Sequence, residues 1–220
     1  MILPVIHTLN LEQVQFNIHL CHNNGIDDIF LINHLAHNWD NASLDFEIYF
    51  NWIKKVYPKM NVGVNYLQLP ALDAIKEAER IGFDYLWADN SYIHKDTLHN
   101  AISIKENKSI KYFGSIAFKY QKPVDDLEWT CKTATNYMDV ITTSGVATAK
   151  SPAIEKIRNM KQYIGDAPLA IASGITADNI SSYKEWVDYF LVASSITDSS
   201  VERINENKLK ALVNAHIKMS

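Results

Sequence analysis

Three features of the sequence predict an α/β fold, a single (β/α)8 TIM barrel. They are eight short apolar runs, stretches of helical spacing between these runs, and a length of 220 residues. Barrels of this class have about 250 residues and can be shorter. No linker, low-complexity tract or block of like charge divides the chain. We therefore expect one barrel domain over residues 1–220.

The eight apolar runs are the expected strands. Several are apolar at consecutive positions, such as 30–32 (FLI) and 190–192 (FLV). Strands that are buried on both faces, as parallel strands are, have this pattern. The expected strands are Pro4–Thr8, Asp28–Asn33, Asn61–Tyr66, Tyr85–Ala88, Lys111–Phe118, Asp139–Thr143, Pro168–Ala172 and Tyr189–Ala193.

The stretches between the strands repeat apolar residues every three or four positions, which is typical of one face of an α-helix. Segment Asn90–Ser109 is long and polar, and we expect it to hold a loop and the fourth helix. After the seventh strand, Thr176 is a good N-cap, so a helix is expected to begin there. Eight strand–helix pairs favour a closed barrel over an open sheet. Clear stripes are Leu11, Val14, Ile18 and Cys21; Leu72, Ile75 and Ala78; Val124, Leu127, Cys131 and Ala134; and Ile157, Met160 and Ile164.

Charge and cysteine content argue against several classes of protein. The net charge is -4, and lysines are interspersed with acids, so no basic surface of the kind that binds nucleic acid is expected. The 2 cysteines, Cys21 and Cys131, form no CxxC pair, which argues against a disulfide scaffold or a cysteine zinc site. We expect both thiols to be buried in helices.

The N-terminal segment and the apolar runs bear on location. Residues 1–6 (MILPVI) lack the charged lead-in and the cleavage site of a signal peptide. No apolar run approaches the roughly 20 residues of a membrane span. We expect a cytoplasmic protein without a membrane span. The sequence leaves the oligomeric state open, and a homo-oligomer is compatible with it.

Polar residues follow several of the expected strands. In a (β/α)8 barrel the site lies at the C-terminal ends of the strands, in the loops that lead to the helices. We expect three of these residues to transfer protons and two asparagines to orient hydroxyl groups of a ligand. The candidate catalytic residues are Lys119, Asp89 and His7 for proton transfer, and Asn33 and Asn65 for orientation.

Each titratable candidate has a structural alternative. Lys119 at a barrel mouth can bind phosphate, act as a base or form a Schiff base, or it can be a solvated surface lysine. Asp89 is a candidate general base or a turn cap. His7 is a candidate general acid or base, or a hydrogen-bonded residue of the core.

Two histidines have a spacing found among metal ligands. His34 and His37 would lie on one face of a helix if the segment were helical. The residues between them suit a loop, however, and histidine is frequent in this chain, with 8 copies. We therefore expect no metal ion, and no other cofactor.

The strongest local signal is segment 170–176 (AIASGIT), in which a buried strand ends in Ser-Gly before the expected helix. A glycine at position 174 lets main-chain amides approach an anion closely, and a helix start adds unpaired N–H groups and partial positive charge. The loops after the seventh and eighth strands are the usual phosphate site of this fold. A plain loop and helix cap is the alternative. The expected phosphate-binding residues are Thr143, Ser173, Gly174, Ser194 and Ser195.

Several segments, in order along the chain, resemble the BtpA family of phosphate-binding TIM barrels. Segment 63–67 (GVNYL) is similar to the family's G-V-N-x-L third strand, and 118–120 (FKY) to the V-K-H end of its fifth. Segment 143–152 (TSGVATAKSP) is similar to T-G-x-A-T-G-K-x-P after the sixth strand, and 172–179 (ASGITADN) to G-S-G-V-T-x-E-N. His7 stands at the family's first-strand histidine. The resemblance runs through most of the chain and is strongest in its second half.

The sequence departs from the family pattern mainly at the chemical end of the site. The family's P-L-P-G after the first histidine is absent, and its E-N at the second strand is Ile32–Asn33, without the carboxylate. Ala149 replaces a glycine of the sixth-strand loop. The resemblance thus implies a retained phosphate end and a rebuilt chemical end. Family members have been linked to photosystem I biogenesis, a role that a shared fold does not transfer.

Two functions from different classes fit these observations. The first is an enzyme that binds a phosphorylated sugar or nucleotide-like small molecule at the barrel mouth, as an isomerase, a lyase or an enzyme that cleaves a glycosidic bond. The second is a non-catalytic phosphate-ligand-binding or assembly protein of the BtpA type, which the missing carboxylate at Ile32–Asn33 favours. In both cases the expected partner is a phosphorylated small molecule.

Overall fold

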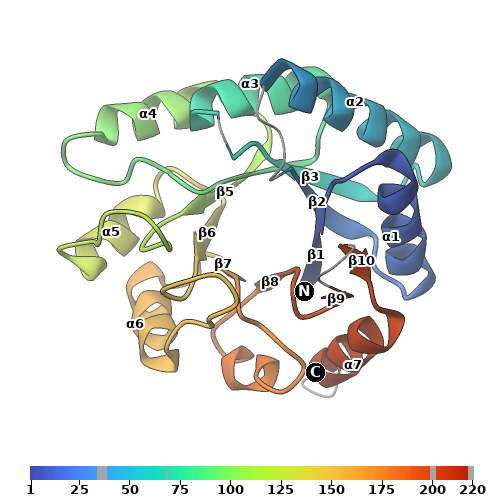
Figure 1. The fold of residues 1–220 in the computed structure, drawn as a ribbon. Coiled ribbons are helices and arrows are strands. Elements are labelled where there is room, and N and C mark those ends of the chain that lie inside the picture. The colour runs from blue at the N-terminus through green and yellow to red at the C-terminus, as the bar shows by residue number, and fades with distance from the viewer. Residues whose placement is uncertain (34–38, 68, 199–201, 218–220) are drawn as a thin grey trace.

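The computed structural model describes residues 1–33, 39–67, 69–198 and 202–217. Eight parallel strands pair in sequential order and close into a barrel, with the helices around its outside (Figure 1). The sheet closes where β1 pairs with β8, with Ile2 opposite Phe190 and Pro4 opposite Val192. The predicted (β/α)8 fold is thus confirmed.

Strands and helices alternate along the chain. The barrel strands are β1 (Ile2–His7), β2 (Asp28–Ile32), β3 (Asn61–Asn65), β4 (Tyr85–Ala88), β5 (Lys111–Ser115), β6 (Val140–Thr143), β7 (Leu169–Ala172) and β8 (Tyr189–Val192). The helices are α1 (Leu11–Asn23), α2 (Trp39–Val56), α3 (Ala71–Ile81), α4 (Leu98–Asn107), α5 (Leu127–Ala134), α6 (Ile154–Ile164) and α7 (Glu206–Ile217). A short 3-10 helix η1 (Ile180–Tyr183) follows β7, and a hairpin of β9 (Thr197–Asp198) and β10 (Arg203–Ile204) precedes α7. None of the described helices is long and apolar enough to span a membrane.

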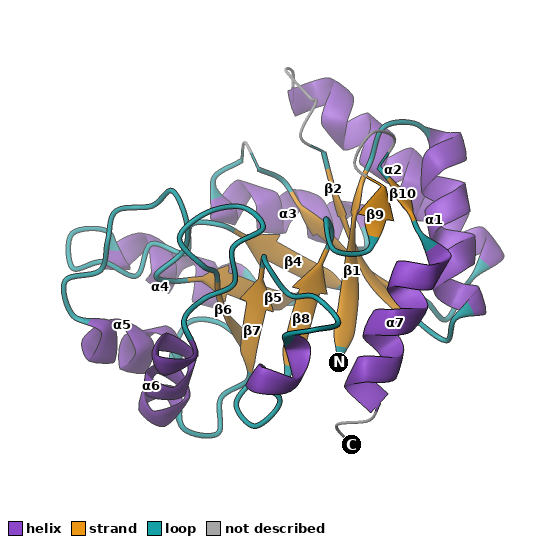
Figure 2. Cartoon of the chain, turned by 60° about the horizontal axis from the view of Figure 1, so that its bottom comes forward, coloured by secondary structure: helices purple, strands orange, loops and turns teal. Residues whose placement is uncertain are grey.

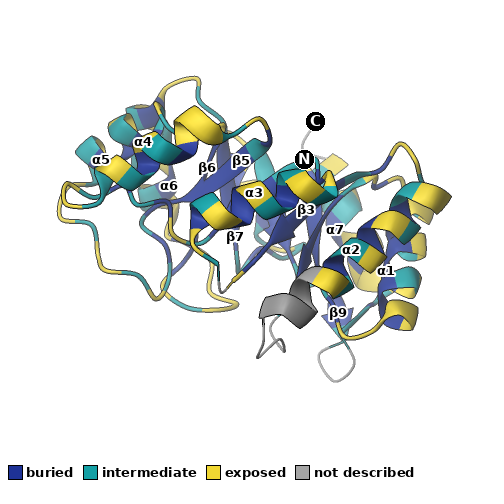
Figure 3. Ribbon diagram, turned by 90° about the horizontal axis from the view of Figure 1, so that it is seen from above, coloured by how far each residue is buried: buried dark blue, intermediate teal, exposed yellow. Residues whose placement is uncertain are grey.

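Apolar residues form two cores, one on each side of the barrel wall. The outer core lies between strands and helices, and Val14, Ile18 and Cys21 of a predicted stripe are fully buried in it. The inner core fills the barrel and includes Phe30 and Phe113, whose ring centroids are 5.2 Å apart. Figure 3 shows buried strands enclosed by helices whose outward faces are exposed. Both cysteines are free and buried, as expected.

Polar and aromatic side chains fill the N-terminal end of the barrel. The Lys111 ammonium group donates a hydrogen bond to Tyr189 Oη (2.8 Å) and lies over the rings of Tyr85 and Phe113. Tyr85 Oη donates in turn to the Asp28 carboxylate (2.6 Å). Because this end is plugged, the opposite end, where the strand-to-helix loops lie, is the place for a ligand.

The fifth strand is shorter than predicted. It ends at Ser115, not at Phe118, because Ala117 has a left-handed main-chain conformation (φ 46°) that interrupts an extended strand. Lys119 therefore lies in a loop beyond the strand end.

The helix predicted to begin at Thr176 is absent. The Asn179 side chain accepts a hydrogen bond from the N–H of Thr176 (2.9 Å) and donates one to the main-chain oxygen of Gly174 (2.8 Å). These two bonds hold the segment in a turn, and the short η1 follows. The prediction of a helix N-terminus beside Gly174 is therefore wrong, and any anion site there depends on turn amides.

Candidate functional site

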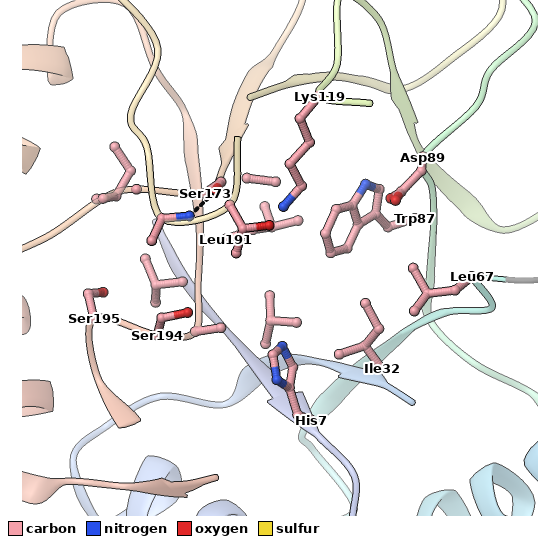
Figure 4. Close-up of a pocket in the computed structure, with 18 of the residues that line it drawn as sticks. His7, Ile32, Leu67, Trp87, Asp89, Lys119, Ser173, Leu191, Ser194 and Ser195 are labelled. Carbon is pink, nitrogen blue, oxygen red and sulfur yellow. Dashed lines mark hydrogen bonds between the residues drawn. The ribbon is translucent and has the colours of Figure 1, made fainter. Parts of the chain in front are cut away.

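A cavity of about 610 Å³ opens at the C-terminal end of the barrel (Figure 4). Small-molecule sites typically measure about 300–1,000 Å³, so the cavity can hold a small organic ligand. Its floor consists of apolar side chains from the strands, and polar residues of the loops form its rim. The floor residues are Val5, Ile32, Trp87, Ala172 and Leu191.

The cavity brings together most of the residues predicted from the sequence. His7 lies on β1 and Lys119 follows β5, and these strands are on opposite sides of an eight-stranded barrel. The two side chains accordingly reach the cavity from opposite walls, as Figure 4 shows. The predicted residues that line the cavity are His7, Asp89, Lys119, Ser173, Gly174, Ser194 and Ser195.

Asn33, Asn65 and Thr143 are not among the lining residues. Asn65 is buried and donates a hydrogen bond to Oδ1 of Asp89 (3.0 Å). Thr143 is also buried, and its hydroxyl donates to the main-chain oxygen of Ala117 (3.2 Å). These two residues therefore contact the site indirectly: Asn65 through the carboxyl group of Asp89, and Thr143 through the loop that carries Lys119. Asn33 lies half-buried at the end of β2, and its role stays a prediction.

The carboxyl group of Asp89 has an unusual environment. Burial raises its pKa above the ordinary value for aspartate. The hydrogen bond from Asn65 and the positive charge of Lys119 act in the opposite direction. A carboxyl group with a raised pKa exchanges protons closer to neutral pH than a solvated aspartate, which suits acid–base chemistry.

Hydrogen bonds from β6 and α6 hold the loop that carries Lys119. Lys156 Nζ donates to the main-chain oxygens of Ala117 (2.6 Å) and Ser144 (2.8 Å). The N–H of Lys119 donates to Ser144 Oγ (2.8 Å), and the Thr143 hydroxyl also reaches Ala117. These contacts stabilise the left-handed conformation of the loop and direct the Lys119 side chain into the cavity (Figure 4).

The loops after β6 and β7 pack against each other through their main chains. Gly174 has φ 73°, and a Cβ atom on it would lie 2.1 Å from the nitrogen of Ser151. Ser173 Oγ accepts a hydrogen bond from the N–H of Ala149 (3.0 Å). The packing of the two loops therefore requires glycine at position 174 whether or not an anion binds. A bulky residue there would displace both loops, so its effect on binding would not identify a ligand contact.

Four main-chain N–H groups in the turns after β7 and β8 have no acceptor within the described part of the chain. They belong to Gly174, Ile175, Ser194 and Ser195, and all four residues line the cavity. The buried Oγ of Ser195 also lacks a hydrogen-bond partner among the described residues. Unpaired donors on two adjacent turns are typical of an anion site.

Some residues of the site were not predicted. On the rim, Tyr120 Oη contacts the nitrogen and the hydroxyl of Thr148, both at 3.2 Å. These two residues lie in strand-to-helix loops, so the barrel rule could have found them. Lys156 lies on a helix and Glu202 lies next to the small hairpin. The sequence marks neither, although a carboxylate oxygen of Glu202 is 3.2 Å from Nδ1 of His7.

The described residues contain no group of three or more histidine, cysteine, aspartate or glutamate side chains that could hold a metal ion. His34 and His37, the pair with a spacing found among metal ligands, lie outside the described residues. The described part of the cavity offers amine, carboxyl, imidazole and amide groups to a ligand.

The chain matches a known protein family over most of its length. The model of the BtpA family matches residues 52–218. The chain belongs to the BtpA family. The matched range includes β3 to β8 and their loops, and with them Asp89, Lys119 and the two turns with unpaired amides. It confirms the resemblance drawn from the sequence.

Solved structures that are similar to this BtpA-family protein share its fold at low sequence identity. The native KDPGal structure matches with a TM-score of 0.71 over 99% of this chain and 95% of that chain, at 13% identity. Phosphoribosyl anthranilate isomerase from Thermus thermophilus gives 0.67 over 100% of both chains, at 11% identity. The 2-keto-3-deoxy-6-phospho-gluconate aldolase from Zymomonas mobilis gives 0.65 over 97% and 90%, at 10% identity. No curated protein matches the chain by sequence.

The raised pKa of Asp89 predicts a pH-dependent cost in stability. A folded-state pKa above the unfolded value means that the folded state binds more protons, so stability falls as pH rises through about 4 and beyond. The variant Asp89→Asn has no carboxyl group to ionise at this position. We therefore expect its free energy of unfolding, minus that of wild type, to increase as pH rises over this range. Urea unfolding between pH 3 and pH 7 measures the difference. The matched control is Asp178→Asn, which changes an exposed aspartate. If the free energies of unfolding of Asp89→Asn and wild type differed by the same amount at every pH, the burial effect would be contradicted.

The lowered pKa of Lys156 predicts that stability increases with pH in the alkaline range. Burial lowers its pKa to about 8, so above that pH the unfolded state binds more protons and wild type gains stability. Lys156→Met removes this titration and two hydrogen bonds, and we expect it to be less stable by about 1–3 kcal/mol at pH 7. The deficit should grow by up to about 3 kcal/mol as pH rises towards the ordinary lysine pKa. Denaturant unfolding from pH 7 to pH 10.5 tests this, with Lys161→Met on the same helix as control. A constant deficit would refute it.

Proposed function

We propose that this BtpA-family protein is an enzyme that binds a phosphorylated sugar or nucleotide-like small molecule and transfers protons on it. The observation that carries the proposal is the composition of one cavity. Unpaired amides of two turns lie there with a lysine, a carboxyl of raised pKa and a histidine. The names of two structural neighbours, a phospho-gluconate aldolase and a phosphoribosyl anthranilate isomerase, contain phosphorylated sugars. They support the proposal at the level of the fold.

The phosphate group would bind at the turns after β7 and β8. Four N–H groups, of Gly174, Ile175, Ser194 and Ser195, can each donate a hydrogen bond to a phosphate oxygen, and the Ser195 hydroxyl can add a fifth. No helix N-terminus supports them, so the amide dipoles and the Lys119 ammonium would balance the charge. This arrangement favours a small phosphate monoester over an extended polyanion.

The rest of the ligand would lie over the apolar floor, between the two walls that carry titratable groups. Lys119 and Asp89 stand on one wall and His7 on the other. One group can remove a proton from the ligand while another returns it at a neighbouring atom. Isomerisation and carbon–carbon lyase reactions need such a pair, and the anchored phosphate would place the reacting atoms between them.

A non-catalytic phosphate-binding protein is the second candidate. The observation that favours it is Ile32, which gives the cavity floor an apolar side chain at the position where the family pattern quoted above has a carboxylate. Such a protein would bind the same phosphate group and leave the ligand unchanged. Binding and turnover must therefore be measured separately.

The phosphate site predicts that Ser194→Glu prevents binding. Ser194 is exposed on the rim, so the fold should tolerate the change, while the new carboxylate repels phosphate at the unpaired amides. Inorganic phosphate and a panel of aldose and ketose phosphates should raise the melting temperature of wild type by mass action, and that of Ser194→Glu much less. Ser181→Glu, an exposed serine on η1, is the matched control and should respond like wild type. Equal stabilisation of all three proteins would place the phosphate elsewhere.

Proton transfer predicts deuterium incorporation into a bound ligand. Wild type in D₂O should exchange a carbon-bound proton of at least one phosphorylated sugar that binds, which NMR detects without knowledge of the product. Lys119→Met should lower the exchange rate by about 100-fold or more under saturating ligand, the usual contribution of a general acid or base, while phosphate binding becomes weaker but persists through the main-chain amides. A ligand that binds wild type without exchange or turnover would favour the non-catalytic function.

A further inference from the structure

Glu202 lies beside the histidine of the barrel mouth. It immediately precedes β10, and one of its carboxylate oxygens is 3.2 Å from Nδ1 of His7. Figure 2 shows the β9–β10 hairpin at the end of the barrel towards which the strands point, next to β1. The side chains of both residues are largely shielded, with exposed fractions of 22% for His7 and 30% for Glu202. A carboxylate and an imidazole thus face each other at the edge of the cavity.

The main chain of Glu202 is strained and firmly held. Its φ of 47° lies in the left-handed region, which is unfavourable for a residue with a side chain. Its carbonyl oxygen accepts hydrogen bonds from two amides of α1, those of Gln13 (2.7 Å) and Asn17 (3.0 Å), and both side chains are buried. Asn17 also accepts a hydrogen bond from the N–H of Ile204 (2.8 Å). Buried amides on a helix therefore fix the position of a strained, partly exposed residue.

The same network fixes the histidine. Gln13 Nε2 donates one hydrogen bond to the main-chain oxygen of Glu202 and another to that of His7 (2.9 Å). One buried side chain thus sets the distance between the two residues. A glycine at position 202 would accept the same main-chain bonds without strain. The main-chain contacts therefore do not require a glutamate at this position, and its side chain adds only the contact with His7 to those described here.

We propose that Glu202 is a positioning residue for His7, an inference that rests on the proposed function for its catalytic consequence. A carboxylate beside Nδ1 attracts the ring proton to that nitrogen, so Nε2 of the neutral ring is the proton acceptor. In the reaction, Nε2 takes a proton from the ligand, the electron pair of the broken bond stays on the ligand, and the ring becomes an imidazolium. Glu202 stabilises that positive charge until the proton returns to the ligand. No oxidant, reductant or third reactant is required.

The ring tautomer tests the inference without any ligand. With ¹⁵N-labelled histidine, NMR distinguishes the two tautomers of a neutral ring, and the His7→Gln spectrum assigns the signal. We expect wild type to carry the proton on Nδ1, although histidine in water favours Nε2. Glu202→Gly keeps the main-chain acceptor and suits the left-handed conformation, so its melting temperature should equal or exceed that of wild type. In this variant the His7 proton should move towards Nε2, and the deuterium-exchange rate should fall by about tenfold or more.

Two further proteins complete the experiment. Glu202→Gln retains an oxygen that can accept from Nδ1 and should recover part of the tautomer preference. Glu12→Gln removes an exposed carboxylate that pairs with Arg203 and should behave as wild type. An Nε2-protonated His7 in wild type, or a tautomer that does not change in Glu202→Gly, would overturn the inference whatever the ligand proves to be. If the tautomer changes in Glu202→Gly as expected but wild type binds no phosphate, the proposed function is rejected and the inference about His7 and Glu202 stands.

Discussion

The hydrogen bonds between β1 and β8 close the sheet and bring the two ends of the chain together. Once Leu3 lies opposite Leu191, the end of β1 adjoins the turn after β8 and the hairpin that follows it. This closure places His7 within reach of Ser194, Ser195 and Glu202. An open sheet of the same strands would leave His7 at one edge and the turn with unpaired amides at the other. The candidate site therefore exists only in the closed barrel.

Contacts between neighbouring loops then shape the mouth. Gly174 packs against the main chain of the loop after β6, and Lys156 ties that loop to the one that carries Lys119. No helix N-terminus supports the turn after β7, because Asn179 bonds its main-chain groups on both sides. The anion binding that we propose for this end would thus depend on main-chain N–H groups that the loops leave unpaired.

The fold could be predicted from the sequence because burial on both faces gives parallel strands a distinctive apolar pattern. The rule that barrel sites lie at strand ends also selected seven of the residues that line the cavity. The rule could not show that Asn65 is buried and bonds to Asp89, since the side chains that meet across neighbouring strands depend on the curvature of the sheet. The helix expected to begin at Thr176 does not begin there, because hydrogen bonds of the Asn179 side chain hold the segment in a turn. Lys156 and Glu202 escaped prediction since their contacts join segments that only the tertiary structure brings together.

Backbone strain in the described residues is concentrated on one face of the molecule. Each non-glycine residue with a positive φ lies in a loop that follows a barrel strand, after β4, β5, β6, β7 or β8. Side chains such as Lys156, Gln13 and Asn17, all covered by the fold, hold several of these loops in place. A stable barrel does not need strained loops, since glycine or a relaxed turn would serve. Strain confined to the mouth, together with a half-buried carboxyl of raised pKa, fits the ligand site that we propose there, because functional sites are often built at some cost in stability. The strained residues are Tyr92, Ala117, Tyr120, Ala149, Ser173 and Glu202.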